Sequence, residues 1–299
     1  MSMNISEINQ YENLGLIAKQ LVDGFITGLH KSPYHGFSVE FAEHKRYNYG
    51  ESTRHIDWKV YARTDKLFTK QYEEETNLRC RILLDNSPSM HYPAPEKDKL
   101  RFSVFAASAL AYLLVKQRDV VGLSVFSDKL ESETDQRSTK DHLNSLLIAL
   151  SRLKSQNPKG KTNIPRVLHR IANKSEKRSL VVIFSDMFQN ENEEELFKAL
   201  QHLKHNKHEV ILFHVSDHRS ELQFDFKDRP YKFIDMETNE SIKVNPWELK
   251  ESYQKAMSSF YQDLKIKCGM MKVDLIPVNT EDSFHKVLSA YLIKRRRMQ

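Results

Sequence analysis

The sequence predicts an α/β fold with a doubly wound, mostly parallel sheet covered by helices on both faces. From Arg79 onward, short β-rich apolar runs alternate with segments of helical periodicity. Strands that alternate with helices favour right-handed crossovers and therefore a parallel sheet. The length of 299 residues, with 39% hydrophobic and 29% charged residues, is typical of a soluble globular chain with a substantial core.

The strands of this sheet are predicted where short β-rich apolar runs end at polar turns. They cover residues 79–85, 120–126, 179–186, 209–216 and 271–278. Helices are predicted over 98–116 and 246–267, because apolar residues recur there at spacings of three or four. Asp98 and Asn245 stand where they can cap these helices.

Residues 1–78 lie outside the α/β rhythm and form a predicted N-terminal extension. An amphipathic helix is expected over 17–29, followed by short β-rich stretches with hairpin character. We therefore expect two parts, the extension at 1–78 and the α/β domain at 79–299. Within the second part, residues 225–242 interrupt the alternation and predict a small hairpin excursion.

Charge and cysteine content narrow the class of protein. The net charge is +6 and the pI is about 9.0, but 40 acidic residues are interleaved with 46 basic ones. Such a mixed surface does not favour a dedicated nucleic-acid binder, so no specific nucleic-acid partner is expected. The two cysteines have no metal-ligand or redox spacing, which fits a reducing compartment.

The sequence predicts a cytoplasmic protein. Its start lacks the features of a signal peptide, and no apolar run approaches the ~18 residues that a membrane span requires. The basic segment 294–298 could nevertheless make a peripheral contact with anionic lipid, or with an acidic protein. A basic helix end that is favoured by the helix dipole accounts for this segment equally well.

Carboxylates and hydroxyls gather at the predicted carboxyl ends of the strands, where ligands bind in doubly wound sheets. Asp85, Ser87 and Ser89 follow the first strand, and residues two apart in an extended loop project to one side. Asp186 ends another buried strand, and Thr162 offers a further hydroxyl from a loop. Two aspartates brought together here would repel each other unless a cation joined them.

These oxygen ligands predict a hard divalent cation. Few carboxylates together with hydroxyls and water suit octahedral Mg²⁺ better than Ca²⁺, with Mn²⁺ as the alternative ion. Asp85 and Asp186 together roughly neutralise such an ion. An open coordination position would then accept an outside anion, such as a glutamate or aspartate of a partner protein.

Two stretches resemble a known family. "DNSPS" at 85–89, with a later threonine and a strand-terminal aspartate, resembles the metal-ion-dependent adhesion site of von Willebrand factor type A domains. "GESTRHIDWKVYARTDKLFTKQYEEE" at 50–75 is similar to the signature of the bacterial "domain of unknown function 58" family, which joins it to such a domain. The resemblance implies a Rossmann-like fold and protein binding through the metal. It also implies a link to MoxR-type AAA+ ATPases, as an accessory in the assembly or maturation of their clients.

The resemblance assigns roles to particular residues. Lys161 stands where many such domains have glycine, and its charge would favour an incoming carboxylate of the partner. The implied metal ligands are Asp85, Ser87, Ser89, Thr162 and Asp186. The upstream signature contributes Arg54, Asp57, Trp58 and Arg63. We expect these residues to have a structural role and to pack the extension against the sheet, because buried charges need partners. The alternative is that they form a recognition surface.

The expected function is a non-enzymatic, metal-dependent protein-interaction module. No G-x-G-x-x-G, P-loop or nucleophile-elbow pattern occurs in the chain. One alternative is a metal-dependent hydrolase that uses the same two aspartates, for which His91 is the only nearby base. A second alternative is a basic nucleic-acid-binding protein.

Overall fold

The computed structural model describes residues 13–30, 44–47, 56, 58–70, 78–93, 97–153, 163–187, 193–236, 238 and 240–298. The chain divides into two compact units. The larger, which we call the α/β unit, consists of Met1–Thr27 and Leu78–Gln299. The smaller, the small unit, consists of Gly28–Asn77.

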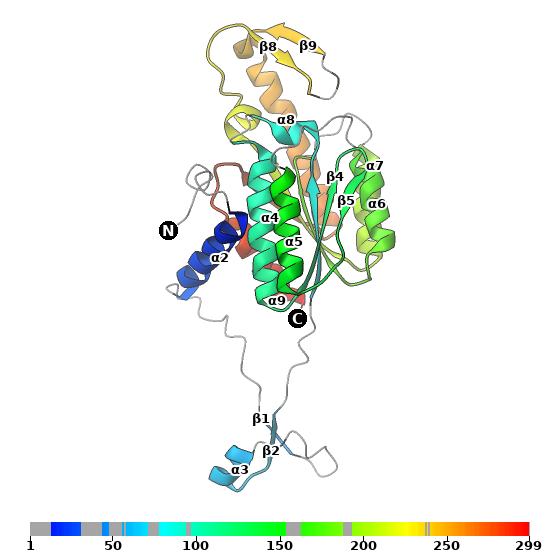
Figure 1. The fold of residues 1–299 in the computed structure, drawn as a ribbon. Coiled ribbons are helices and arrows are strands. Elements are labelled where there is room, and N and C mark those ends of the chain that lie inside the picture. The colour runs from blue at the N-terminus through cyan, green and yellow to red at the C-terminus, as the bar shows by residue number, and fades with distance from the viewer. Residues whose placement is uncertain are drawn as a thin grey trace. The chain divides into compact units, whose positions relative to one another are not determined.

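A six-stranded sheet forms the centre of the α/β unit (Figure 1). Its strands are β3 (Arg79–Asp85), β4 (Val120–Phe126), β5 (Leu130–Glu133), β6 (Leu180–Ser185), β7 (Glu209–Ser216) and β10 (Asp274–Asn279). Their order is β10-β7-β6-β3-β4-β5. All neighbours are parallel except the edge strand β5, which runs antiparallel to β4. The predicted doubly wound, mostly parallel sheet is confirmed.

The central strands are apolar along their length because helices cover both faces of the sheet. All of β6 is buried, and in β3 every residue except Arg79 is buried. The bounds of β3, β4 and β7 are those predicted from the sequence. β10 begins later than predicted, because the preceding helix continues to Met270 and a turn follows it.

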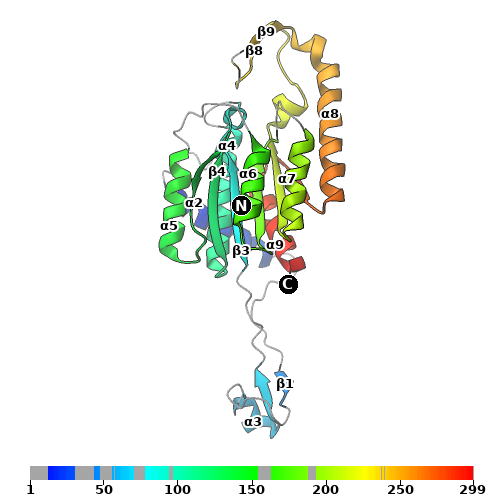
Figure 2. The same ribbon diagram turned by 90° about the vertical axis from the view of Figure 1, so that its right-hand side faces the viewer.

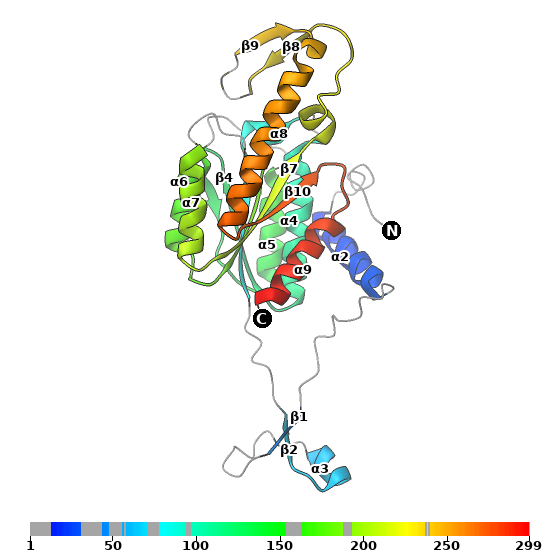
Figure 3. The ribbon, with the colours of Figure 1, turned by 180° about the vertical axis from the view of Figure 1, so that it is seen from behind.

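Two helical layers cover the sheet (Figures 2 and 3). The helices of the α/β unit are α2 (Leu14–His30, of which residues up to Thr27 belong to this unit), α4 (Lys99–Lys116), α5 (Lys140–Leu153), α6 (Ile164–Lys174), α7 (Glu193–His205), α8 (Pro246–Met270) and α9 (His285–Met298). Residues of α6, α7 and α8 share one hydrophobic core with the sheet. On the other face α4 packs against α5 and α9. In the described part of the chain, no helix is long and apolar enough to cross a bilayer.

Helix α2 packs within the α/β unit, far in the sequence from the sheet. Its apolar positions recur at helical spacing and are buried, among them Ile17, Leu21 and Phe25. The ring of Phe25 contacts that of His285 in α9, with 5.4 Å between centroids, and Asp23 pairs with Lys116 of α4 at 2.8 Å. The predicted division into 1–78 and 79–299 therefore differs from the structural one in the position of this helix, which belongs to the larger unit.

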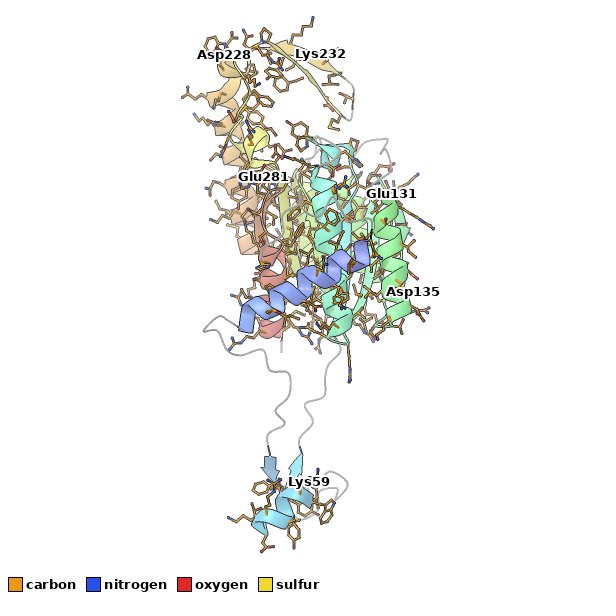
Figure 4. The ribbon with its side chains drawn as sticks, turned by 60° about the vertical axis from the view of Figure 1, so that its left-hand side comes forward. Lys59, Glu131, Asp135, Asp228, Lys232 and Glu281 are labelled. Atoms are coloured by element: carbon orange, nitrogen blue, oxygen red, sulfur yellow. The ribbon has the colours of Figure 1, made fainter. Side chains whose placement is uncertain are left out.

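The small unit has the helix and hairpin character predicted for it. Strands β1 (His44–Arg46) and β2 (Phe68–Lys70) pair antiparallel, and α3 (Trp58–Thr64) lies between them in the sequence. In the α/β unit, the predicted excursion also forms a hairpin, which follows the short helical turn η3 (His218–Leu222). It consists of β8 (Tyr231–Ile234) and β9 (Ser241–Val244), and Figure 4 labels Lys232 on it.

Candidate metal centre

The candidate site lies at the point where the order of strands reverses. β4 lies on one side of β3 and β6 on the other, so the connections leaving β3 and β6 diverge at the carboxyl edge of the sheet. Asp85 is the last residue of β3, and Asp186 directly follows β6. β3 and β6 are paired neighbours, so the two aspartates lie at the carboxyl ends of adjacent strands.

Asp85 is buried and held by two neutral donors. Its Oδ1 accepts a hydrogen bond from the backbone amide of Ser87 at 2.9 Å, and its Oδ2 accepts one from Ser185 Oγ at 2.6 Å. Burial, with the nearby negative charge of Asp186, raises the pKa of Asp85 to about 7. The site therefore holds a carboxylate whose charge is unfavourable without a cation.

Ser87 and Ser89 converge as their spacing of two predicts. The Oγ atoms lie 3.0 Å apart, with Ser87 buried and Ser89 half-buried. The short 3-10 helix η2 (Pro88–His91) starts between them, and Pro88 restricts the backbone there. Two hydroxyl oxygens thus lie on the loop that begins at Asp85.

A buried lysine, which the sequence reasoning missed, completes the site. Lys99 is the first residue of α4, and its fully buried Nζ donates to Asp186 Oδ2 at 2.7 Å. The same ammonium group forms a second ion pair with Glu221 of η3. Burial disfavours the charged form, but the two carboxylates outweigh it and hold the pKa of Lys99 above its ordinary value.

One signal in the sequence could have indicated Lys99. A crossover helix after a parallel strand begins at the carboxyl edge of the sheet, and the helix start was predicted at Asp98, whose side chain does accept from Arg101 N. Glu221 had no comparable signal, because it lies in the irregular segment after β7. Burial raises the pKa of Glu221, although the charge of Lys99 opposes that rise.

The charges of the site leave room for a divalent cation. Asp85, Asp186 and Glu221 supply three carboxylates, and Lys99 supplies one ammonium group. With all four of these groups charged, their negative charges outnumber the positive charge by two. Nearby His214 of β7 adds none, because burial lowers its pKa to about 4 and keeps it neutral.

The chemistry of the donors also fits a hard cation. The groups that converge are carboxylate and hydroxyl oxygens, which Mg²⁺ and similar ions prefer. Among the described residues, no cluster of three or more His, Cys, Asp and Glu side chains is arranged to hold a metal. The serine hydroxyls are therefore needed to complete any ligand set here, as the D-x-S-x-S spacing predicts.

Side chains at the rim fix the loop after β3. Asn86 donates from Nδ2 to Glu131 Oε2 at 2.9 Å, which ties the loop to β5, and Glu131 is labelled in Figure 4. The Nε2 atom of His91 lies 3.2 Å from Asn86 Oδ1. His91, the base considered for a hydrolase, is thus engaged with the loop.

The structure leaves several predicted site residues untested. Lys161 and Thr162 lie outside the described residues, as do Arg54 and Asp57 of the upstream signature. Trp58 and Arg63 are described in α3, where Trp58 is 62% exposed and Arg63 is also exposed. Their expected role in packing the extension against the sheet stays a prediction.

Comparison with known proteins identifies relatives of the chain. The model of a family described as "Protein of unknown function DUF58" matches residues 43–260. Uncharacterized proteins of Mycobacterium tuberculosis and Mycobacterium bovis are 22% identical over 285 residues, covering 95% of this chain and 88% of theirs.

Two solved structures are similar to the chain at a lower sequence identity. BatB, a conserved hypothetical protein from Bacteroides thetaiotaomicron, is 16% identical with a TM-score of 0.47, covering 74% of this chain and 99% of that one. A proximal thread matrix protein from the mussel byssus, with a zinc-occupied MIDAS motif, is 16% identical with a TM-score of 0.36. It covers 47% of this chain and 38% of that one.

Proposed function

We propose that the α/β unit of this chain, which belongs to the family described as protein of unknown function DUF58, is a metal-dependent protein-interaction module. The observation that carries this proposal is the pair of converging serine hydroxyls beside a buried, incompletely compensated group of carboxylates. A bound cation would relieve the repulsion between Asp85 and Asp186. It would also offer a partner protein a point of attachment at the carboxyl edge of the sheet.

The proposed ion is Mg²⁺, with Mn²⁺ as a substitute. The residues that would hold it are Asp85, Ser87, Ser89 and Asp186, with Thr162 as a further proposed ligand. When bound, the ion would supply one coordination position for an anionic ligand from outside. The chain itself would position the hydroxyls through the η2 turn and hold Asp186 through Lys99.

The proposed partner is a protein that supplies a glutamate or aspartate to the ion. The family resemblance implies a MoxR-type AAA+ ATPase or one of its clients, and we propose that class of partner. We also propose that the chain acts in the cytoplasm. Lys161 would attract the incoming carboxylate, with a contribution that salt should keep small. No catalytic step is proposed, since binding alone accounts for the donor set.

The test is a binding measurement between the full chain and a purified MoxR-type ATPase from the same source, with Mg²⁺ and with EDTA. Ser87→Ala combined with Ser89→Ala should weaken binding about as much as EDTA does. The two treatments should not add, because both remove the same metal-mediated contact. Ser258→Ala with Ser259→Ala, at two exposed positions of α8, is the matched control and should bind like the wild type.

Two results would count against the proposal. Binding that survives both EDTA and Asp186→Ala would place the interface away from the metal. Metal-dependent turnover of generic phosphoester substrates, lost in Asp85→Ala, would instead favour the hydrolase that uses the same aspartates.

A further inference from the structure

Basic residues occupy an unusual backbone conformation at the turns that precede four parallel strands. Arg118, Arg178, Lys207 and Lys272 have φ values of 62°, 65°, 63° and 57°. Each lies two residues before the first residue of its strand, β4, β6, β7 or β10 respectively. Glycine is the usual residue where a helix ends in this left-handed region, because a Cβ atom is strained there. These strained turns therefore carry long cationic side chains at positions where glycine would be less strained.

These turns place the cations in a row along the amino edge of the sheet. The strand order puts Lys272, Lys207 and Arg178 before three adjacent strands, and Arg118 before β4 on the far side of β3. Neighbouring strands lie about 4.8 Å apart, so the row extends across roughly 19 Å. All four side chains are exposed. Arg296 and Arg297, exposed in the last turn of α9, extend the same surface.

The end of α9 is fixed at this edge by ion pairs. Lys294 contacts Asp274 at the start of β10 at 2.8 Å and Glu209 at the start of β7 at 2.6 Å. Arg295 contacts Asp119, next to the start of β4, at 2.7 Å. Figure 3 shows the C-terminal end of α9 below the sheet. We call the surface formed by Arg118, Arg178, Lys207, Lys272, Arg296 and Arg297 the basic face.

The charge of the basic face is not balanced by the acidic residues beside it. Asp119, Glu209 and Asp274 are engaged with Arg295 and Lys294, and Glu176 pairs with Arg79. The ion pairs formed between described residues at this edge involve Arg79, Lys204, Lys294 and Arg295, and none of the six cations of the basic face. The helices that end at this edge each contribute roughly half a negative charge. The negative helix ends therefore offset part of the positive charge of the basic face, and a net positive charge remains.

Exposed apolar side chains accompany the cations. Met270, at the end of α8 and two residues before Lys272, is 79% exposed, the highest value among the exposed large hydrophobic residues of the described chain. Ile293 is 54% exposed and lies three and four residues before Arg296 and Arg297, on the same face of α9. Cations beside exposed apolar side chains are typical of surfaces that bind at the lipid–water interface.

We propose that the basic face docks the α/β unit onto an anionic phospholipid bilayer. A broad row of cations with apolar side chains at its border fits a surface of lipid headgroups. Single-stranded nucleic acid fits less well, because its binding surfaces combine cations with aromatic side chains on which bases stack. The exposed large aromatic residues of the described chain, Trp58, Tyr61 and Trp247, lie in α3 and at the start of α8. Docking in this way would direct the candidate metal centre, at the opposite edge of the sheet, away from the membrane.

The test uses co-sedimentation of the full chain with vesicles of phosphatidylcholine, either pure or mixed with phosphatidylglycerol, at about 0.1 M salt. The chain should bind only the anionic vesicles. Replacing Arg118, Arg178, Lys207 and Lys272 by glycine should weaken that binding at least a hundred-fold, since each cation near an anionic surface contributes roughly five-fold. The same variant should keep or raise the melting temperature, because glycine relieves the strained turns. Met270→Ser should weaken binding by a few-fold without a change in net charge.

A control of equal charge separates this surface from general basicity. Lys227, Lys232, Lys243 and Lys250 are exposed in and around the hairpin excursion, and their replacement by glutamine also removes four charges. That variant should bind anionic vesicles like the wild type. An equal loss in the control, or no binding of the wild-type chain to anionic vesicles, would overturn the proposal. Tighter binding to duplex DNA than to anionic vesicles, with the same loss in the glycine variant, would identify nucleic acid as the ligand instead.

Discussion

Asp85 and Asp186 lie at the ends of neighbouring strands in different electrostatic surroundings. Asp186 receives the ammonium group of Lys99, whereas the donors to Asp85 are a backbone amide and a hydroxyl, both neutral. A buried carboxylate that is bound only by neutral donors is costly to ionise. Asp85 is therefore the residue whose charge depends most directly on an added cation.

The first prediction is that Asp85→Asn stabilises the metal-free protein at pH 8. The folded-state pKa of about 7 exceeds the ordinary value of 3.8, so the folded chain favours the protonated form. The stabilisation from that proton is complete below pH 3.8 and is lost as pH rises through 7. At pH 8 the wild type lacks this stabilisation, because Asp85 is ionised. Asparagine carries no charge and avoids the cost of ionising the buried carboxyl group. That cost is up to about 1.4 kcal/mol for each pH unit between the ordinary and the folded-state pKa.

Thermal unfolding in EDTA checks this prediction. The melting temperature of Asp85→Asn should exceed that of the wild type at pH 8, and the difference should shrink toward pH 5. With millimolar Mg²⁺ the order should reverse, because an ion bound only to the folded wild type adds stability by mass action. A lower melting temperature for the variant in EDTA at pH 8 would show that the charge of Asp85 is already compensated.

Lys99 allows a second prediction at the same scale. Lys99→Met removes the buried ammonium group that pairs with Asp186 and Glu221, and it should destabilise the protein in EDTA by roughly 3–5 kcal/mol. Added Mg²⁺ should raise the melting temperature of this variant more than that of the wild type, because more negative charge is left uncompensated. Lys116→Met is the control. Its pair with Asp23 is about half exposed, so both effects should be small.

At the scale of elements, α2 is the helix whose position differed from expectation. Its sequence predicts an amphipathic helix but contains no information about which unit covers the apolar face. The structure places that face against the helices of the α/β unit, where Phe25 is 3% exposed and Leu16, on the opposite face, is 44% exposed. The helix therefore contributes to the stability of the α/β unit from a distant part of the sequence.

The corresponding prediction is that Phe25→Ala lowers the free energy of unfolding by about 3–5 kcal/mol, as expected for a buried aromatic side chain. Leu16→Ala should change it by less than about 0.5 kcal/mol, because surface substitutions have small effects. Urea denaturation of the full chain measures both values. Equal, small effects would mean that α2 is not held against the α/β unit in solution.

The bounds of several elements agree with those predicted from the sequence, whereas contacts between distant elements could not be predicted. The apolar runs of β3, β4 and β7 end at polar turns, so their bounds were predictable, and the capping side chain of Asp98 marked the start of α4. The positions of Asp85, Ser87, Ser89 and Asp186 at the ends of β3 and β6 were predictable because strand ends are local features, and their role as metal ligands stays a prediction. Lys99 and Glu221 were not identified, because their pairing joins positions 122 residues apart and depends on how α4 and η3 meet over the sheet.

At the scale of the whole molecule, the two ends of the α/β unit differ in charge. The carboxyl edge of the sheet holds buried carboxylates, and the amino edge carries the basic face. The net charge of +6 shows only a mild excess of basic residues. The topology produces the separation, because the five parallel strands place the turns that precede them at one edge and the turns that follow them at the other.

The proposed metal centre requires that the carboxyl edge of the sheet binds a divalent cation. The most direct measurement is a titration of the metal-free full chain with Mn²⁺, in which electron paramagnetic resonance reports the free ion. We predict one saturable Mn²⁺ site per chain, from which Mg²⁺ displaces the Mn²⁺ ion. The site should be lost in both Asp85→Ala and the Ser87→Ala, Ser89→Ala double variant. The absence of saturable binding by the wild type, or undiminished binding by these variants, would contradict it.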